Sequence, residues 1–296
     1  MNGVFDYWQS RAHREPSKLS PADIGEIVKF LRGDFCFVET LSDRLDNVEN
    51  RLVRLTNEQA QIMEALSLNT HLLIEGNAGT GKTLLAVDFA RKKAAAGSKV
   101  LYLTYNKNLA NNVTRQLRKM DNPDKHANPN ALDKLKVINI HALFAEYVPI
   151  NVEVMKDNPQ IYFSEILPEE FYEYVSNLSA DELEKLQYDV LVMGEGQDIL
   201  NPLYLYSLDA LLKNGLDKGD WAVFYDEKQN IYNPEYSDGI DMLMGYNNTK
   251  FKLFVNCRNT VQIGTYSSKV SGIDLGEFIK ENGEEVEKLS YSDEAS

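Results

Sequence analysis

Residues 71–83 combine a short apolar run, a glycine-rich turn and the start of a segment rich in alanine and leucine. The turn fits the pattern GxxxxGK(S/T), with Gly76, Gly81, Lys82 and Thr83 at its four specified positions. This pattern indicates a phosphate-binding loop where a strand precedes it and a helix follows it, and both flanking segments have those compositions. Glycines are needed because a Cβ would block the backbone conformations that turn N–H groups towards a polyphosphate. The chain is therefore expected to contain an α/β unit that binds a nucleotide.

The loop contains the residue types that bind a nucleoside triphosphate. The following helix directs its positive N-terminal end at the phosphates, and Lys82 adds an ammonium for the β- and γ-phosphates. Thr83 offers a hydroxyl to Mg²⁺, so ATP and Mg²⁺ are the expected cofactors. The expected nucleotide-binding residues of the loop are Gly76, Asn77, Ala78, Gly79, Thr80, Gly81, Lys82 and Thr83.

Apolar runs alternate with helix-compatible segments along the rest of the chain. Beyond the first strand, strands are expected at residues 99–104, 137–140, 189–193, 221–225 and 252–255. Helices are expected at residues 107–119, 168–175, 179–186, 203–212 and 260–268, and three more precede the loop, near residues 20–33, near residues 41–55 and from Thr56 onward. Strands that alternate with long helices require a parallel sheet with right-handed crossovers. Such a sheet binds ligands at the carboxyl ends of its strands, where the loop would lie.

Composition excludes some classes of protein and leaves others open. No apolar run is long enough for a membrane span, and two cysteines without ligand spacing argue against a zinc site and suit a reducing compartment, so we expect a cytoplasmic protein. The net charge of −14 disfavours nucleic acid as a partner. However, residues 84–136 carry eleven Lys and Arg against four Asp and Glu, while residues 151–200 carry two against twelve. A local basic face therefore remains possible.

Five further motifs occur along the chain: Leu55-Thr56-x-x-Gln59, Leu103-Thr104-Tyr105-Asn106-Lys107, Glu195-x-Gln197-Asp198, Tyr225-Asp226-x-x-Gln229 and Asn256-Cys257-Arg258-Asn259. With these motifs the chain resembles superfamily 1 (UvrD/Rep-like) helicases, and within them bacterial DNA/RNA helicases that carry a nuclease-related (NERD) domain. The resemblance implies a RecA-like P-loop NTPase fold with a short helical N-terminal extension. It divides the chain into a leader with N-terminal helices (1–54), motor domain 1A (55–275) and an acidic tail or the start of a second domain (276–296).

The same resemblance implies roles for residues around the nucleotide. Gln59 would read the adenine, although from spacing alone it could be a capping-box residue that reaches back to Thr56. Glu195 would be the general base, Gln229 the sensor of the γ-phosphate, and Arg258 an arginine finger. Together with Lys82, the last three form the expected catalytic set.

A second set of residues resembles the contacts that such helicases make with single-stranded nucleic acid. These are Thr104, Tyr105, Asn106 and His141. An aromatic ring in this place would stack on a base, which is worth about 1–3 kcal/mol. For Tyr105 and His141 the alternative is ordinary packing at a strand end.

The chain also departs from the helicase pattern. Gly194 stands where the family has the aspartate that anchors the Mg²⁺ water shell, so ATP hydrolysis is expected to be impaired, and an aspartate at this position is expected to restore it. Cys257 replaces a tyrosine that stacks on adenine in related repair helicases. The chain stops soon after Arg258, before a second RecA-like domain, so that domain or a partner subunit is an expected partner and the chain alone is expected to be weak or inactive.

The leading hypothesis is therefore the ATP-binding first motor domain of a helicase or translocase that moves on single-stranded nucleic acid in the complete protein. An alternative is an ATP-dependent switch or pseudo-ATPase that acts as a binding module. A kinase or GTPase is disfavoured because no Asn-Lys-x-Asp guanine signature occurs.

Overall fold

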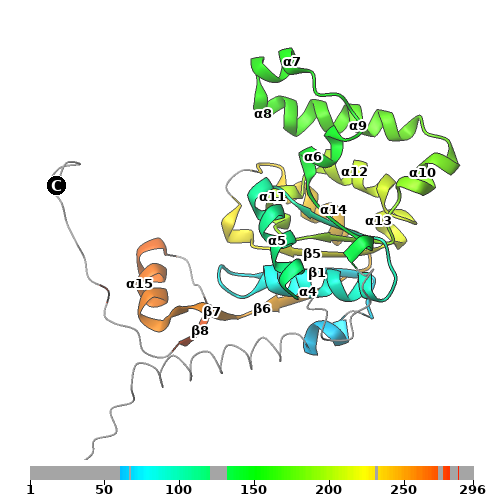
Figure 1. Cartoon of the computed structure of the whole chain (residues 1–296). Helices are drawn as coiled ribbons and strands as arrows, with labels where there is room; N and C mark the ends of the chain where they lie inside the picture. The colour runs from blue at the N-terminus through cyan, green and yellow to red at the C-terminus, as the bar shows by residue number, and fades with distance from the viewer. Residues whose placement is uncertain are drawn as a thin grey trace, which may run out of the picture. The chain divides into compact units, whose positions relative to one another are not determined.

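Six parallel strands form a sheet in the order β3-β2-β4-β5-β1-β6 (Figure 1). This computed structural model describes residues 61–66, 68–120, 132–230, 233–272, 276–280 and 286, all within the second of two units of the chain, residues 48–296. The strands are β1 (His71–Gly76), β2 (Val100–Thr104), β3 (Leu135–Asn139), β4 (Val190–Met193), β5 (Asp220–Tyr225) and β6 (Thr249–Leu253). The predicted α/β fold with a parallel sheet flanked by helices is confirmed, and it is compatible with a RecA-like fold.

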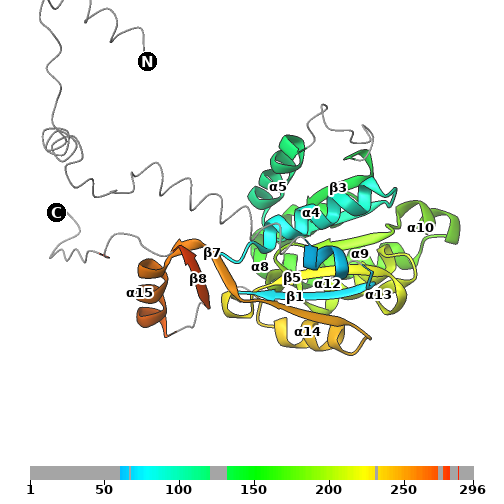
Figure 2. The ribbon, with the colours of Figure 1, turned by 90° about the horizontal axis from the view of Figure 1, so that it is seen from below.

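Both faces of the sheet are covered, which explains why the strands are apolar throughout. Because successive side chains of a strand point to opposite faces, Leu72 and Ile74 contribute to one core and Leu73 to the other. The first core packs against α4 (Lys82–Ala95) and α5 (Lys107–Met120). The second packs against α6 (Ile140–Ala145), α9 (Leu167–Ser176), α11 (Gly196–Ile199), α12 (Pro202–Leu211) and α14 (Tyr236–Met244). The result is a three-layer arrangement with α4 on the opposite side of the sheet from α12 (Figures 1 and 2).

The acidic segment between β3 and β4 is helical. It contains α7 (Val152–Asp157), α8 (Pro159–Ile161), a π-helical turn (Tyr162–Ile166), α9 and α10 (Ala180–Leu186). α10 agrees with the helix expected over residues 179–186, and a capping box of Ser179 and Glu182 begins it. α7, α8 and α9 stand above α6 and α12 on the side away from the sheet (Figure 1). Further short helical segments are a stretch over residues 61–66, a 3₁₀ turn (Leu132–Lys134), α13 (Gly215–Lys218) and a second 3₁₀ turn (Glu227–Gln229).

A small two-stranded sheet follows β6. It pairs β7 (Val255–Thr260) with β8 (Glu277–Lys280) in parallel, and α15 (Val261–Ser271) lies between them in the chain. The single strand expected at 252–255 is wrong in its bounds, because β6 ends at Leu253 and Val255 already belongs to β7. The N-terminal helices expected within residues 1–54 lie outside the described residues, as does most of the expected tail.

The third strand also differs from its prediction. It begins at Leu135 and ends at Asn139, so His141 lies in the first turn of α6 rather than at the strand end. Ile140 is fully buried and begins the helix, which packs into the core beside β3. None of the helices in the described part of the chain combines the length and the apolar character that a membrane span needs.

Candidate functional site

The glycine-rich turn joins β1 to α4 at the carboxyl edge of the sheet. Gly79 and Gly81 have φ angles of 82° and 85°, in the left-handed region that other residues rarely adopt. The Thr80 hydroxyl donates to the Asn77 carbonyl over 2.8 Å and closes the turn. A Cβ on Gly76 would lie 2.6 Å from that hydroxyl oxygen, so the turn needs glycine there for space rather than for its φ angle. The predicted strand, loop and helix are therefore present, with the bend that a phosphate cradle requires.

Lys82 begins α4 and reaches back across the turn. Its ammonium donates to the carbonyls of Gly76 and Asn77 over 2.7 and 3.0 Å. It also forms an ion pair with Asp226, with 3.3 Å between Nζ and Oδ2. The two side chains are only 7% and 2% exposed, so the pair is shielded from water. This lysine thus joins the loop to the end of β5.

Polar side chains after β4 and β5 form one hydrogen-bonded network with this lysine. The strand order places β4, β5 and β1 side by side, so their carboxyl ends meet. Gln197 links the ends of β4 and β5. Its amide nitrogen donates to Glu195 over 3.0 Å, and its amide oxygen accepts from the Asp226 backbone N–H over 3.0 Å. Gln229 donates to Asp226 Oδ2 over 2.8 Å. Three of the four predicted catalytic residues, Lys82, Glu195 and Gln229, are therefore brought together, through Asp226 and Gln197.

Asp226 is the central residue of this network, and sequence reasoning quoted it only as part of a motif. Its position directly after a buried strand is the signal that could have identified it, because parallel sheets gather such strand-end residues at one edge. Asp198 lies close by, one turn after Glu195. Burial, with a smaller contribution from the Glu195 charge, raises the pKa of Asp198 to about 6 from its ordinary value of 3.8. A carboxyl with this pKa changes its charge just below neutral pH.

The place of the absent aspartate is filled by another side chain. A Cβ on Gly194 would lie 3.0 Å from Cζ and 3.1 Å from Cε1 of Tyr102, and closer still to its hydroxyl oxygen. Tyr102 lies in β2 and is fully buried. A larger residue at position 194 therefore requires the Tyr102 side chain to shift, and the expectation that an aspartate there would restore hydrolysis stays a prediction. No local sequence signal could have shown this contact, because the two residues meet across neighbouring strands.

The other side of the glycine turn is held by β7. Asn256 is fully buried and donates to the Ala78 carbonyl over 2.8 Å, while the Cys257 backbone N–H donates to the Gly79 carbonyl over 2.8 Å. Gly79 needs to be glycine here, because a Cβ would lie 2.7 Å from the Asn256 amide oxygen. Burial raises the pKa of the Cys257 thiol. The motif predicted to contain the arginine finger thus contacts the loop through the residues before Arg258.

Gln59 and Arg258 complete the predicted nucleotide site. Gln59 lies outside the described residues, so its assignment as the adenine reader stays a prediction. The backbone of Arg258 belongs to β7, two residues after the Asn256 contact, and its role as an arginine finger also stays a prediction. Thr83 lies in the first turn of α4 and is half-buried.

The carboxyl edge of the sheet has oxygen donors but no cluster of protein metal ligands among the described residues. Among the residues with described positions, no three His, Cys, Asp or Glu side chains are grouped so that they could hold a metal ion. The oxygen donors present, a threonine hydroxyl and strand-end carboxylates, suit Mg²⁺ where a nucleotide supplies further oxygens.

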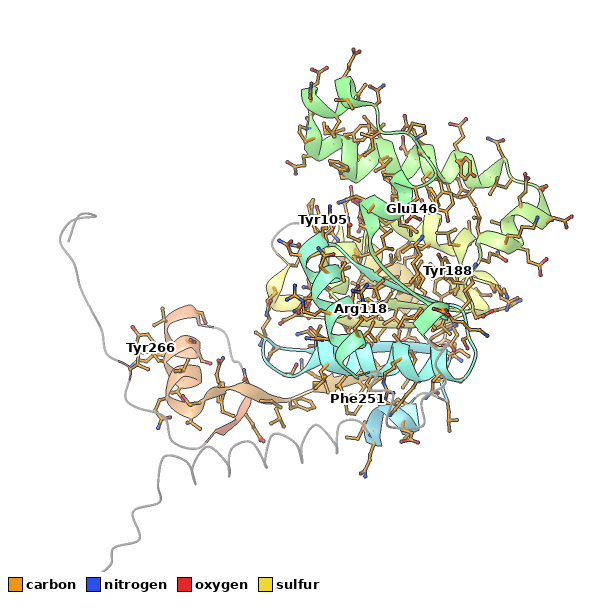
Figure 3. All side chains as sticks on the ribbon, viewed as in Figure 1. Tyr105, Arg118, Glu146, Tyr188, Phe251 and Tyr266 are labelled. Carbon is orange, nitrogen blue, oxygen red and sulfur yellow. The ribbon has the colours of Figure 1, made fainter. Side chains whose placement is uncertain are left out.

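The residues predicted to contact single-stranded nucleic acid lie at and just after the end of β2 and in the first turn of α6. Tyr105 and His141 are neighbours, with ring centroids 5.1 Å apart in an edge-to-face arrangement. Figure 3 shows Tyr105 near the N-terminal end of α5. Thr104 is fully buried and donates to the Asn106 carbonyl, and the Asn106 side chain accepts from the Asn108 backbone N–H. Thr104 and Asn106 therefore shape the turn that presents Tyr105.

His141 is part of an aromatic cluster. It shares a hydrogen bond of 2.9 Å with the Tyr204 hydroxyl and packs on Phe163, with ring centroids 4.9 Å apart. Burial lowers the pKa of His141 to about 4, so the ring is neutral at physiological pH. These contacts favour packing over base stacking for His141. Tyr105, which is half-buried, keeps part of its surface exposed.

The sequence of the chain matches a known protein family. The family model described as Schlafen group 3, DNA/RNA helicase domain matches residues 69–255, which is more than half of the chain. The matched stretch runs from just before β1 to the first residue of β7, so it includes the loop and the network at the strand ends. A search of curated proteins found no match.

Proposed function

Because the chain belongs to the Schlafen group 3 DNA/RNA helicase domain family, we propose that it is the ATP-binding first motor domain of a superfamily 1 helicase or translocase. The observation that carries this proposal is the buried contact of Lys82 with Asp226, which joins the glycine turn to the network of Glu195 and Gln229. A binding loop alone would serve many nucleotide-binding proteins. Its direct link to polar residues at two further strand ends is what hydrolysis requires.

In the proposed reaction, the backbone N–H groups of the glycine turn and the N-terminal end of α4 bind the phosphates. Lys82 exchanges its contacts with the two carbonyls and with Asp226 for contacts with phosphate oxygens. Asp226 then keeps the hydrogen bond from Gln229. Thr83 would hold Mg²⁺, which neutralises charge on the phosphates when it is bound. Glu195 accepts a proton from the attacking water, and Gln197 keeps its carboxylate in place. Gln229, bonded to the same carboxylate as Lys82, responds when the lysine moves.

Coupling to nucleic acid would begin at Tyr105, which follows β2 and is adjacent to the edge where the nucleotide binds. We propose that its exposed face stacks on a base of single-stranded DNA or RNA. Movement along the strand needs a second RecA-like domain, which we propose as the partner of this one.

Titration calorimetry with ADP and Mg²⁺ tests the nucleotide site. Lys82→Ala should weaken binding by about 1–3 kcal/mol, the usual scale for a charge-assisted hydrogen bond. Lys92→Ala is the matched control, because Lys92 lies on the same helix but pairs with Asp88 at the surface. Equal affinities for all three proteins, measured well below their melting temperatures, would refute the site.

One observation favours a second function, an ATP-dependent switch. Tyr102 fills the space at Gly194 where a helicase has its strand-end aspartate, which favours binding without rapid hydrolysis. A steady-state ATPase assay with and without single-stranded DNA or RNA separates the two functions. The helicase proposal expects stimulation by nucleic acid, whereas a switch would bind ATP and show no stimulated turnover.

A further inference from the structure

The Tyr102 side chain ends at the carboxyl edge of the sheet, although its backbone lies inside β2. Tyr102 pairs with Val192 of the neighbouring strand β4, two residues before Gly194. The backbone N–H of Gly194 donates to the Leu103 carbonyl over 3.0 Å, which holds this glycine against β2. The ring extends along β4 and occupies the volume of a residue-194 side chain. The phenol thus takes the position from which an aspartate would act.

The Tyr102 hydroxyl is a buried polar group without a hydrogen-bond partner among the described residues. Burying a hydroxyl without a partner is costly, so such a group in a candidate site indicates a partner that binds there. Burial, together with the nearby Glu195 charge, raises the pKa of Tyr102 well above its usual range. The hydroxyl is therefore neutral at every physiological pH and available as a donor.

Glu195 is the acceptor that suits this donor. It follows Gly194 directly, and one of its carboxylate oxygens accepts the hydrogen bond from Gln197. A carboxylate has about four acceptor positions, so it can accept a second donor from the opposite side. A donor there would fix the carboxylate between two hydrogen bonds and hold its orientation towards water.

We propose that Tyr102 is a positioning residue that replaces the strand-end carboxylate of this site, with its hydroxyl donating to Glu195 when a nucleotide is bound. This inference rests on the proposed function and adds to it the way in which the site works without an aspartate. Gly194 is then a requirement of the site, because any larger residue would displace the phenol.

The steric part of the proposal is tested by a double-mutant cycle that needs no nucleotide. Gly194→Ala should lower the melting temperature by roughly 3–10 °C, the scale of overpacking in a domain of this size. Combined with Tyr102→Phe, which removes the nearest atom, the same substitution should cost less than half as much. Equal losses in both backgrounds would show that the phenol does not fill this space, and would overturn the proposal.

The donor part is tested with the full chain by comparing two ligands. ADP with Mg²⁺ probes ground-state binding, and the same ligand with aluminium fluoride mimics the phosphoryl group in transfer, which depends on the placement of Glu195. Tyr102→Phe should weaken binding of the fluoride complex about 10-fold and change ADP affinity by less than about 3-fold. Tyr162→Phe is the control, because Tyr162 is equally buried but bonds to the Asn151 backbone N–H. It should leave the ratio of the two affinities unchanged.

The possible outcomes separate this proposal from the one on which it rests. If Tyr102→Phe weakens both ligands equally, or neither, the hydroxyl has only a structural role and the proposal is overturned. If the unmodified chain binds ADP but gains nothing from aluminium fluoride, nucleotide binding stands and the role of Tyr102 is refuted. If it binds neither ligand, the proposed function fails and the inference fails with it.

Discussion

Replacing Lys82 with alanine is expected to destabilise the ligand-free chain, and replacing Asp226 with asparagine in the same chain should recover most of the loss. The charges lie 3.3 Å apart, an attraction of about 5 kcal/mol at an effective dielectric constant of about 20. Removing one partner of a buried pair usually costs about 3–5 kcal/mol, because the other charge is left uncompensated. Asp226 would keep the donors from Gln229 and from the Lys228 backbone N–H. We therefore expect a loss of about 2–3 kcal/mol, below the usual range.

Urea denaturation followed by circular dichroism, at pH 7.5 without nucleotide, measures this loss. It corresponds to a fall in melting temperature of about 4–12 °C. The double variant Lys82→Ala/Asp226→Asn should lie within about 1 kcal/mol of the unmodified chain, because no buried charge is left without a partner. Lys92→Ala should cost less than about 1 kcal/mol, since its pair with Asp88 is at the surface. A double variant no more stable than Lys82→Ala alone would show that the buried pair does not form.

Three further predictions address other parts of the site. Asn256→Ala should lower ADP affinity about 10-fold in calorimetry, because the buried amide that holds the Ala78 carbonyl is lost; unchanged affinity would show that β7 does not support the loop. Asp198→Asn should be more stable than the unmodified chain at pH 7.5, with a smaller difference at pH 4, in thermal melts. The pKa of Asp198 is raised to about 6 in the folded chain, so its protonated form contributes stability. This contribution is fully present below about pH 4 and is lost as the pH rises through about 6. Equal stability of the two proteins at both pH values would contradict this. Tyr105→Ala should weaken binding of a fluorescent single-stranded oligonucleotide by about 1–3 kcal/mol in anisotropy titrations. Tyr172→Ala, at an exposed tyrosine of α9, should not.

Much of the fold follows from local patterns in the chain. The glycine turn, the apolar runs and the intervening helices predict a parallel sheet, because each signal depends on residues close together in sequence. The start of α10 at Ser179 could be predicted for the same reason, since a capping box spans four residues. The third strand shows the limit of this reasoning. Its apolar pattern continues through Ile140, yet packing of that residue against the core begins a helix there.

The candidate site also has a part that the sequence predicted and a part that only the structure shows. The phosphate-loop pattern identified Lys82, and the resemblance to superfamily 1 helicases pointed to Glu195 and Gln229, because both rest on short motifs along the chain. They could not show that Asp226 and Gln197 join these residues, since the contacts depend on which strands are neighbours. The strand order β4-β5-β1 does not follow the order along the chain.

The sequence by itself determined the type of fold, the loop that can bind phosphate and the absence of an aspartate at position 194. Only the tertiary structure decided what occupies the space beside Gly194, because Tyr102 reaches it from another strand, more than ninety residues earlier in the chain. Hydrophobic period and motif spacing describe neighbours along the backbone. The volume available to one side chain depends on the register of the strands that pack around it, and that register is set only when the whole sheet forms.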